Sequence, residues 1–431
     1  MDFTEAQEYL FSLGNEVSAM KLGLENIRAL LSELGDPQAK YLKVQVAGTN
    51  GKGSVCAFLD SICNEAGIRT GVFTSPHLVS ITERIRVNGI DISEERFAEV
   101  ATTIRNTAET MLADGRLEYR PTFFEQITAI ALVYFAESDL ELAILETGLG
   151  GRLDATTAAD AEIAVITRID LDHQEYLGET IEEIAAEKAA IISTNTKAVV
   201  IGEQSEPALQ VLLDRCRTFV LLPDAANRKY GGALDFSKGK QQVFERESTT
   251  PDDLGVKLGL AGRHQVENAY TALMIAGILY RDFDMDISED EIRQGWKKAQ
   301  NPGRLEQQGR FLFDGAHNVN GAAALREYLG ESVDKPMTVI FGAMREKNVG
   351  EIASLLWPIA SKLILTRLEN SRSMTGQELA TFLPAGFSGE LVVTDYVSEA
   401  IREAQVCDNE NLILVTGSLY LIGEVKKLLD N

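Results

Sequence analysis

The sequence predicts an α/β protein with two domains, each built on a largely parallel sheet covered by helices. Three observations predict this class. Short apolar runs alternate with longer segments of helical periodicity along almost the whole chain, and the alternation is interrupted once before it starts again. Clusters of polar residues directly follow several apolar runs. A chain of 431 residues is long enough to give each domain a substantial core.

The first series contains five predicted strands. They are short runs rich in β-branched residues, and helical patterns such as residues 123–137 lie between them. Parallel neighbours need a long crossover connection, so helices between strands indicate a parallel sheet. The predicted strands are residues 43–48, 69–75, 140–148, 162–169 and 197–203.

A second series follows an interruption at about 223–260, where short strands and turn residues predict a small β excursion. A helical stretch at 264–280 then leads into the new alternation. We place the boundary near Asn301 and predict domains at 1–300 and 301–431, facing each other across a ligand-binding cleft. The predicted strands of the second series are residues 310–318, 337–344, 362–369, 390–396 and 411–418.

Composition excludes several classes of protein. A net charge of −24 disfavours a nucleic-acid-binding surface, and a charged fraction of 25% is typical of a folded globular chain. No secretory signal and no apolar membrane span is visible, so we expect a cytoplasmic protein that binds no membrane. We also expect a monomer. The four cysteines show no metal-ligand spacing, which indicates reduced, buried thiols.

A glycine-rich loop at 46–55, VAGTNGKGSV, lies where a predicted strand turns into a predicted helix that stops near Gly67. Backbone amides at such a turn, with the helix dipole, bind anions. Lys52 would add a positive charge between phosphates, and the Ser54 hydroxyl a ligand for Mg²⁺. The spacing departs from the usual phosphate loop, and an ordinary glycine turn is the alternative. The predicted nucleotide loop is Gly48, Thr49, Asn50, Gly51, Lys52, Gly53 and Ser54.

Other polar motifs follow predicted strands at their carboxyl ends, where open α/β sheets bind ligands. Glu146 stands between an apolar strand and a glycine-rich stretch, residues 148–151, which favours a metal-binding carboxylate over a helix-capping or solvated acid. Asp170, Asp172 and His173 follow the next strand, and Ser75 lies on a proline turn beside His77. Each of the four histidines, His77, His173, His264 and His317, falls in a cluster of glycine, acid or amide residues.

Nine motifs, in order, resemble the folylpolyglutamate synthase and dihydrofolate synthase family of the Mur ligase superfamily, from about residue 20 to the C-terminus. The resemblance implies a phosphate-loop-containing Mur-ligase-type ATPase domain and a smaller, Rossmann-like α/β domain. It identifies GTNGKGS as the superfamily's own form of the loop. The motifs are GTNGKGS, TSPHL, FFEQITA, ETGLGGRLDAT, LDHQEYLG, EKAAI, PGRLE, DGAHN and TGSLYL.

The family's reaction is the expected activity: ATP phosphorylates a carboxylate, and the amine of L-glutamate displaces phosphate from the acyl phosphate. The resemblance assigns catalytic roles to Lys52, His173, Lys188 and His317. It implies that Mg²⁺, replaceable by Mn²⁺, is held by Ser75, Glu146 and His173 with Ser54 nearby. It further implies that Lys188 is carbamylated and binds a second ion; the alternative is an ordinary exposed helix lysine.

The resemblance also assigns binding residues. Asn268 is expected at the base of ATP, Arg304 at a phosphate, and Asp314 near the ribose, with His317 in the same loop. Because Arg304 and Asp314 begin the second domain, domain closure would complete the site. The implied pterin pocket is lined by Thr122, Phe123, Phe124, Glu125, Leu153, Asp154 and Ala155, together with the segment near Gly23. One of the two phenylalanines is expected to belong to the core instead.

Some positions depart from the family pattern, namely Thr157, Ala190, Val319 and Glu346. None removes a charge or a metal ligand, so the departures bear on fine substrate contacts. The acceptor stays open between dihydropteroate, folates or both. Alternatives are a murein-precursor ligase, against which TSPHL and FFEQITA count, and a nucleotide-driven switch without an acceptor.

Overall fold

The computed structural model describes residues 1–14, 23–221, 256–333, 336–406 and 411–430, and the backbone of three short strands at 224–225, 232–234 and 243–245. The chain divides into two compact units. The first comprises Met1–Pro76, Ile81–Gly259 and Val266–Ala299, and the second comprises His77–Ser80, Leu260–Gln265 and Gln300–Asn431. Two short segments that precede the expected boundary near Asn301 thus belong to the second unit.

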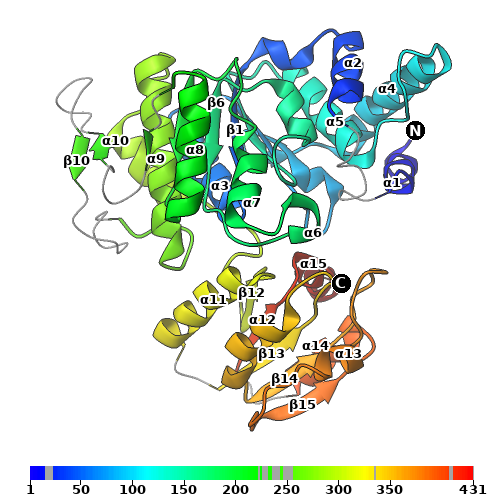
Figure 1. Ribbon diagram of the computed structural model, residues 1–431. Helices are drawn as coiled ribbons and strands as arrows, with labels where there is room; N and C mark the ends of the chain where they lie inside the picture. The colour runs from blue at the N-terminus through cyan, green and yellow to red at the C-terminus, as the bar shows by residue number, and fades with distance from the viewer. Residues whose placement is uncertain are drawn as a thin grey trace. The chain divides into compact units, whose positions relative to one another are not determined.

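The first unit is built on an eight-stranded sheet with the order β4-β3-β2-β5-β1-β6-β7-β8 (Figure 1). The neighbouring strands in the part of the sheet that runs β2-β5-β1-β6-β7-β8 are parallel to each other. At the other edge, β3 pairs antiparallel with both β2 and β4. All five predicted strands form. The strands are β1 (Leu42–Ala47), β2 (Thr70–Phe73), β3 (Ile85–Val87), β4 (Ile90–Asp91), β5 (Leu142–Glu146), β6 (Ile163–Ile166), β7 (Ala198–Ile201) and β8 (Asp224–Ala225).

Helices cover this sheet. They are α1 (Phe3–Ser12), α2 (Glu25–Glu33), α3 (Lys52–Glu65), α4 (Glu94–Ala113), α5 (Phe123–Glu137), α6 (Gln174–Leu177), α7 (Ile181–Ala189), α8 (Glu206–Thr218), α9 (His264–Asp282) and α10 (Glu289–Lys298). Three short 3₁₀ helices are η1 (Pro37–Lys40), η2 (Ile81–Arg84) and η3 (Ala155–Ala159). α5 starts at a capping box in which Thr122 and Glu125 bond each other's backbone amide, a device that stabilises a helix start by about 1 kcal/mol.

Two apolar clusters cover one face of the first sheet. Leu145 of β5 packs with α4 and α5, and Ala164 of β6 packs with α7 and α8. Gln45 of β1 pairs in register with both of these residues, so this polar side chain lies on the same face, between the two clusters. The helix after the glycine loop, α3, contacts β1, β2 and β5 and packs against α10.

The second unit is a six-stranded sheet with the order β11-β12-β16-β13-β14-β15, parallel except for β11 (Figure 1). One core cluster joins it to α11, α12 and α13, and another to α14 and α15. Its strands are β11 (Glu306–Gln308), β12 (Phe311–Asp314), β13 (Met337–Phe341), β14 (Lys362–Leu365), β15 (Glu390–Val393) and β16 (Leu412–Thr416). Its helices are α11 (Val319–Ser332), α12 (Val349–Leu356), η6 (Trp357–Ile359), α13 (Gly376–Ala380), α14 (Val397–Gln405) and α15 (Leu419–Leu429).

The predicted fold class is confirmed: both units are helix-covered, mainly parallel sheets. Of the predicted β excursion, β9 (Gly232–Leu234) and β10 (Val243–Glu245) form an antiparallel pair, and most of the rest lies outside the described residues. Cys56, Cys63 and Cys216 are buried and unbridged, whereas Cys407 lies outside the described residues. No helix in the described part of the chain combines the length and apolar character that a membrane crossing requires.

Candidate active site

The glycine-rich loop forms the turn from β1 to α3, and two of its glycines are required by close contacts. A Cβ on Gly48 would lie 1.9 Å from Thr167 Oγ1. A Cβ on Gly51 would lie 2.4 Å from Asn268 Oδ1, and Gly51 has a φ of +92°, which L side chains rarely adopt. The loop backbone therefore packs directly against the end of β6 and against α9, and Asn268, expected at the base of ATP, lies beside it.

The amides of this loop divide into two groups. Those of Thr49 and Asn50 both donate to the carbonyl oxygen of Arg168, at 2.9 and 3.1 Å, so they hold the loop rather than face an anion. Those of Lys52, Gly53 and Ser54 form the first turn of α3, where helical amides have no intrahelical acceptor. An anion site at this turn is therefore confined to the second half of the loop.

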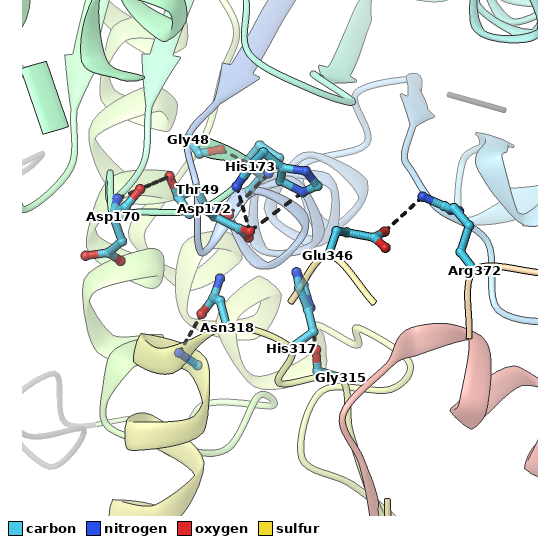
Figure 2. Close-up of polar contacts among 12 residues, drawn as sticks. Gly48, Thr49, Asp170, Asp172, His173, Gly315, His317, Asn318, Glu346 and Arg372 are labelled. Atoms are coloured by element: carbon cyan, nitrogen blue, oxygen red, sulfur yellow. Dashed lines mark hydrogen bonds and ion pairs between the residues drawn. The ribbon is translucent and has the colours of Figure 1, made fainter. Parts of the chain in front are cut away.

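Asp170 holds the first half of the loop from the β6 side. Its amide donates to Thr49 Oγ1 at 3.1 Å, and Thr49 Oγ1 donates to its carbonyl oxygen at 3.0 Å (Figure 2). Its carboxylate accepts from Asn50 Nδ2 at 2.8 Å and pairs with Arg168 Nε at 3.3 Å. The sequence singled out Asp170 only as an acid after a strand; the structure gives it a structural role in the loop.

Two lysines meet at the loop. Lys52 Nζ donates to the carbonyl oxygens of Gly48 and Thr49, at 3.0 and 3.3 Å, and Lys188 Nζ donates to Gly48 O at 2.9 Å. Lys188 is only 4% exposed, so it is not the exposed helix lysine that the sequence allowed as an alternative. Burial, and then the charge of Lys52, lower the pKa of Lys188 to about 7.

The predicted metal ligands lie at the carboxyl ends of strands. Glu146 ends β5 and is buried, and its Oε2 accepts from the amide of Ser75, which follows β2. His173 has a left-handed backbone, and its amide donates to the Asp172 carboxylate at 2.9 Å (Figure 2). No three His, Cys, Asp or Glu side chains of the described segments gather as a metal site would require. A metal bound to Glu146 and His173 would take its other ligands from hydroxyl, water or phosphate oxygens.

The first unit contains a pocket of about 410 Å³, a volume that includes space open to solvent. Both phenylalanines belong to the core cluster, and Phe124 also lines the pocket. Phe123, which was expected in the pocket, does not line it; it stacks on Phe11 and is contacted by the guanidinium of Arg84. The lining residues are Gly23, Leu24, Thr122, Phe124, Glu125, Gly148, Leu149, Leu153, Asp154 and Ala155.

Asp154 is one of two buried acids that line this pocket. Its Oδ1 accepts from the amide and hydroxyl of Thr156, and its Oδ2 accepts from the amide of Leu149 at 2.9 Å. Burial raises the pKa of Asp154, and these hydrogen bonds oppose the rise. Glu125 is also buried, and burial raises its pKa too.

In the second unit, the buried carboxylate of Asp314 bonds two backbone amides, those of Leu305 and Ala316, both at 3.0 Å. Leu305 has a φ of +46°, so Asp314 fixes a strained turn directly after Arg304. His317 Nδ1 lies 2.8 Å from Gly315 O (Figure 2). Since a carbonyl oxygen only accepts, Nδ1 carries the proton and Nε2 is the basic nitrogen.

Comparison with known proteins defines the class first. The chain matches the family model "Mur ligase middle domain" over residues 46–276 and the model "Mur ligase, glutamate ligase domain" over residues 303–419. It is therefore a member of the Mur ligase superfamily. The first match contains the glycine-rich loop, and the second contains the turn around Asp314.

Relatives narrow the assignment. The chain is 36% identical to the dihydrofolate synthase/folylpolyglutamate synthase of Bacillus subtilis over 420 residues, covering 95% of each chain. The chain belongs to the folylpolyglutamate synthase/dihydrofolate synthase family, as the sequence motifs indicated. It is also 33% identical to the probable bifunctional folylpolyglutamate synthase/dihydropteroate synthase of Haloferax volcanii. That match includes 99% of this chain but only 50% of the relative, so the chain spans about half of the relative's length.

Solved structures agree. Mycobacterium tuberculosis folylpolyglutamate synthase, complexed with ADP and AMPPCP, matches with a TM-score of 0.85 and 28% identity over 100% of this chain and 99% of that one. Escherichia coli FolC in complex with DHPP and ADP matches with a TM-score of 0.82 and 28% identity, over 100% of this chain and 98% of that one. A bifunctional folylpolyglutamate synthase/dihydrofolate synthase with Mn, AMPPNP and L-glutamate bound matches with a TM-score of 0.82 and 29% identity, over 100% of this chain and 98% of that one.

Proposed function

We propose that the chain is an ATP-dependent ligase that joins L-glutamate to dihydropteroate, to folates or to both through an amide bond, with release of ADP and phosphate. Family membership supports the class of reaction, and the ligands in the titles of the solved relatives support these substrates. The observation in this chain that carries the proposal is the convergence of Lys52 and Lys188 at Gly48, beside the first turn of α3.

The difficult part of such a reaction is bringing an anionic carboxylate to the anionic γ-phosphate of ATP. Lys52 and the amides of Lys52, Gly53 and Ser54 would stabilise the negative charge of the transferring phosphoryl group. Lys52 now binds carbonyl oxygens, so it would exchange Gly48 O and Thr49 O for phosphate oxygens. The acyl phosphate so formed is attacked by the glutamate amine, and phosphate leaves.

A divalent ion fits the donors present. Glu146 supplies a charged oxygen, His173 an imidazole, and Ser54 and Ser75 hydroxyls, a mixture of hard and borderline ligands that suits Mg²⁺ or Mn²⁺. The contact between Glu146 and the amide of Ser75 shows that β2 and β5 bring two of these residues together. When bound, the ion would offset phosphate charge.

Lys188 would carry a carbamate. Its neutral amine adds to CO₂, forming an N–C bond and releasing one proton, and a pKa of about 7 makes the neutral amine abundant at pH 7. The carbamate nitrogen keeps one hydrogen for Gly48 O, while the new oxygens would bind a second divalent ion. The modification also replaces repulsion between Lys52 and Lys188 by attraction.

The remaining predicted residues keep their proposed roles. Asn268, beside Gly51, would contact the base, and Arg304, Asp314 and His317 of the second unit would contact the nucleotide. For Asp314 the contacts add a second role, because its carboxylate shapes the turn that follows Arg304. The pocket lined by Thr122, Phe124, Glu125, Leu153, Asp154 and Ala155 would receive the pterin. Monomeric state and cytoplasmic location stay predictions.

One experiment tests the proposal. ADP release is measured with dihydropteroate or tetrahydrofolate as acceptor, each with and without L-glutamate. Release that requires an acceptor together with glutamate is expected, and the product should contain one added glutamate by mass. Equal ADP release without any acceptor would contradict a ligase and favour a nucleotide-driven switch.

A further inference from the structure

Gln45 is a polar side chain in the apolar face of the first sheet, and it is only 1% exposed. Its Nε2 donates to Thr156 Oγ1 at 2.9 Å and to Thr157 Oγ1 at 2.8 Å, with Thr147 Oγ1 at 3.4 Å. Gln45 is thus bonded to the 3₁₀ helix η3, which begins directly after Asp154. A buried amide placed in an apolar layer costs free energy unless its hydrogen bonds are made, so these contacts set its position.

These hydrogen bonds have a direction when Asp154 is ionised. The Gln45 amide nitrogen only donates, so both threonine hydroxyls accept from it and pass their own protons onward. Thr156 Oγ1 donates to Asp154 Oδ1, and Thr157 Oγ1 donates to the carbonyl oxygen of Gly151 at 2.8 Å. Each of these two hydroxyl hydrogens thus has one acceptor. A side chain at position 45 that cannot donate would leave both hydroxyls without their donor.

The chain of bonds ends at the acid of the pocket. Asp154 is 4% exposed and lines the pocket, and three donors from Thr156 and Leu149 fix its carboxylate. The amide of Gly148 is a fourth hydrogen-bond donor to this carboxylate, so Asp154 joins the Gly148–Leu149 turn to the start of η3. These hydrogen bonds therefore hold the wall of the pocket that Gly148, Leu149 and Asp154 form.

We propose that Gln45 is a positioning residue for the acceptor substrate: through Thr156 it holds Asp154, and with it the wall of the pocket that would receive the pterin. The inference rests on the proposed function. It also gives Thr157 a role, because this departure from the family pattern supplies the second acceptor for the Gln45 amide. Among the described residues, the Gln45 side chain bonds Thr147, Thr156 and Thr157 and no residue of the nucleotide loop, so we expect its main effect on the acceptor.

The test compares Gln45→Met and Thr156→Val with the unmodified enzyme. Binding of 7,8-dihydropteroate, without ATP or glutamate, is followed by the fluorescence of the pterin, and KM is measured for dihydropteroate and for ATP. Loss of a hydrogen bond that supports a charged group should weaken dihydropteroate binding, and raise its KM, about tenfold. The KM for ATP should stay within about twofold of the unmodified value.

Two variants control for structure. Thr156→Ser keeps the hydroxyl and should restore binding to within about threefold. Thr128→Val removes another buried hydroxyl, for which the described structure gives no hydrogen-bond partner, and should bind dihydropteroate normally. If Gln45→Met does not fold, the Thr156→Val and Thr156→Ser pair carries the test alone, because both keep Gln45.

The outcomes are distinguishable. Normal dihydropteroate binding by folded Thr156→Val, or equal losses in Thr156→Val and Thr156→Ser, would overturn the role of the hydrogen bonds while leaving the ligase intact. An unmodified enzyme that binds neither dihydropteroate nor tetrahydrofolate would instead contradict the proposed function.

Discussion

Lys52 and Lys188 donate hydrogen bonds to the same carbonyl oxygen, that of Gly48, at 3.0 and 2.9 Å. Two ammonium groups that share one acceptor repel each other, and this repulsion adds to burial in lowering the pKa of Lys188. A negative charge at this place, either a phosphate of ATP or a carbamate on Lys188, would relieve the repulsion. The loop is therefore arranged to favour an anion before one binds.

Lys52→Ala should abolish turnover while leaving the fold intact. Within the described part of the chain the Lys52 ammonium bonds only loop carbonyls, whereas it would offset phosphate charge in the transition state. We expect a loss of about two or more decades in the rate of ADP release. Lys298→Ala removes an exposed ion pair with Glu65 and serves as a control, with normal activity and a free energy of unfolding within about 0.5 kcal/mol. A fully active Lys52→Ala enzyme would contradict the phosphate-loop assignment.

Stability should depend on pH through Lys188. Folding lowers its pKa from 10.5 to about 7, so between these values the unfolded chain binds one more proton than the folded chain. Stability should therefore rise with pH through this window, by about 1.4 kcal/mol per pH unit from this group alone. Below pH 7 both states are protonated, and the burial penalty is fully present.

The measurement is denaturant unfolding of the unmodified protein and of Lys188→Met in CO₂-free buffer, at several pH values from 7 to 10. The difference in unfolding free energy between the two proteins should change with pH as stated above, because Met does not titrate. A difference that is constant over this range would mean that Lys188 keeps its ordinary pKa.

Asn50 and Asp170 should be energetically coupled. Their side chains share one hydrogen bond of 2.8 Å, and that bond fixes the half of the loop whose amides do not face the anion. Asp170→Ala and Asn50→Ala should each weaken binding of a non-hydrolysable ATP analogue several-fold, and a double-mutant cycle should give a coupling of about 1 kcal/mol. Calorimetric titration measures both. Strictly additive losses would show that the two residues act independently.

Glu146 and His173 should determine the metal dependence. Glu146→Gln keeps the shape of the side chain but removes its charge, so it should raise the concentration of Mg²⁺ needed for half-maximal activity. His173→Ala should do the same. Glu94→Gln, which changes an exposed acid in the first turn of α4, is the matched control. Unchanged Mg²⁺ dependence in both test variants would remove these residues from the proposed metal site.

Much of the fold could be predicted because periodic burial leaves a regular pattern in the sequence. The strands β1, β5 and β6 are almost wholly buried, and they read as apolar runs. The strands β3 and β4 were missed because they are only three and two residues long, too short for a period to develop. The glycine loop was found because its backbone requires glycine.

Hydrogen-bond networks were not predicted, since their partners are far apart in the chain. Gln45 and Thr156 are separated by 111 positions, and Asn50 and Asp170 by 120. No spacing rule connects such residues. Asp314 was expected at the ribose of the nucleotide, but the backbone contacts that occupy its carboxylate are visible only in the structure.

The last prediction concerns the carbamate on Lys188. Intact-mass measurement of the unmodified protein, kept at neutral pH because carbamates decompose in acid, should show the added mass of CO₂, and Lys188→Ala should not. Activity of Lys188→Ala should fall and be partly restored by a short carboxylic acid that fits the vacated space, since the acid would replace the anionic oxygens. The buried position and the pKa of about 7 favour the reaction, because they supply a neutral amine at physiological pH. Full activity and unchanged Mg²⁺ dependence in Lys188→Ala would leave Lys188 as a structural lysine, and the proposed site would then need only one divalent ion.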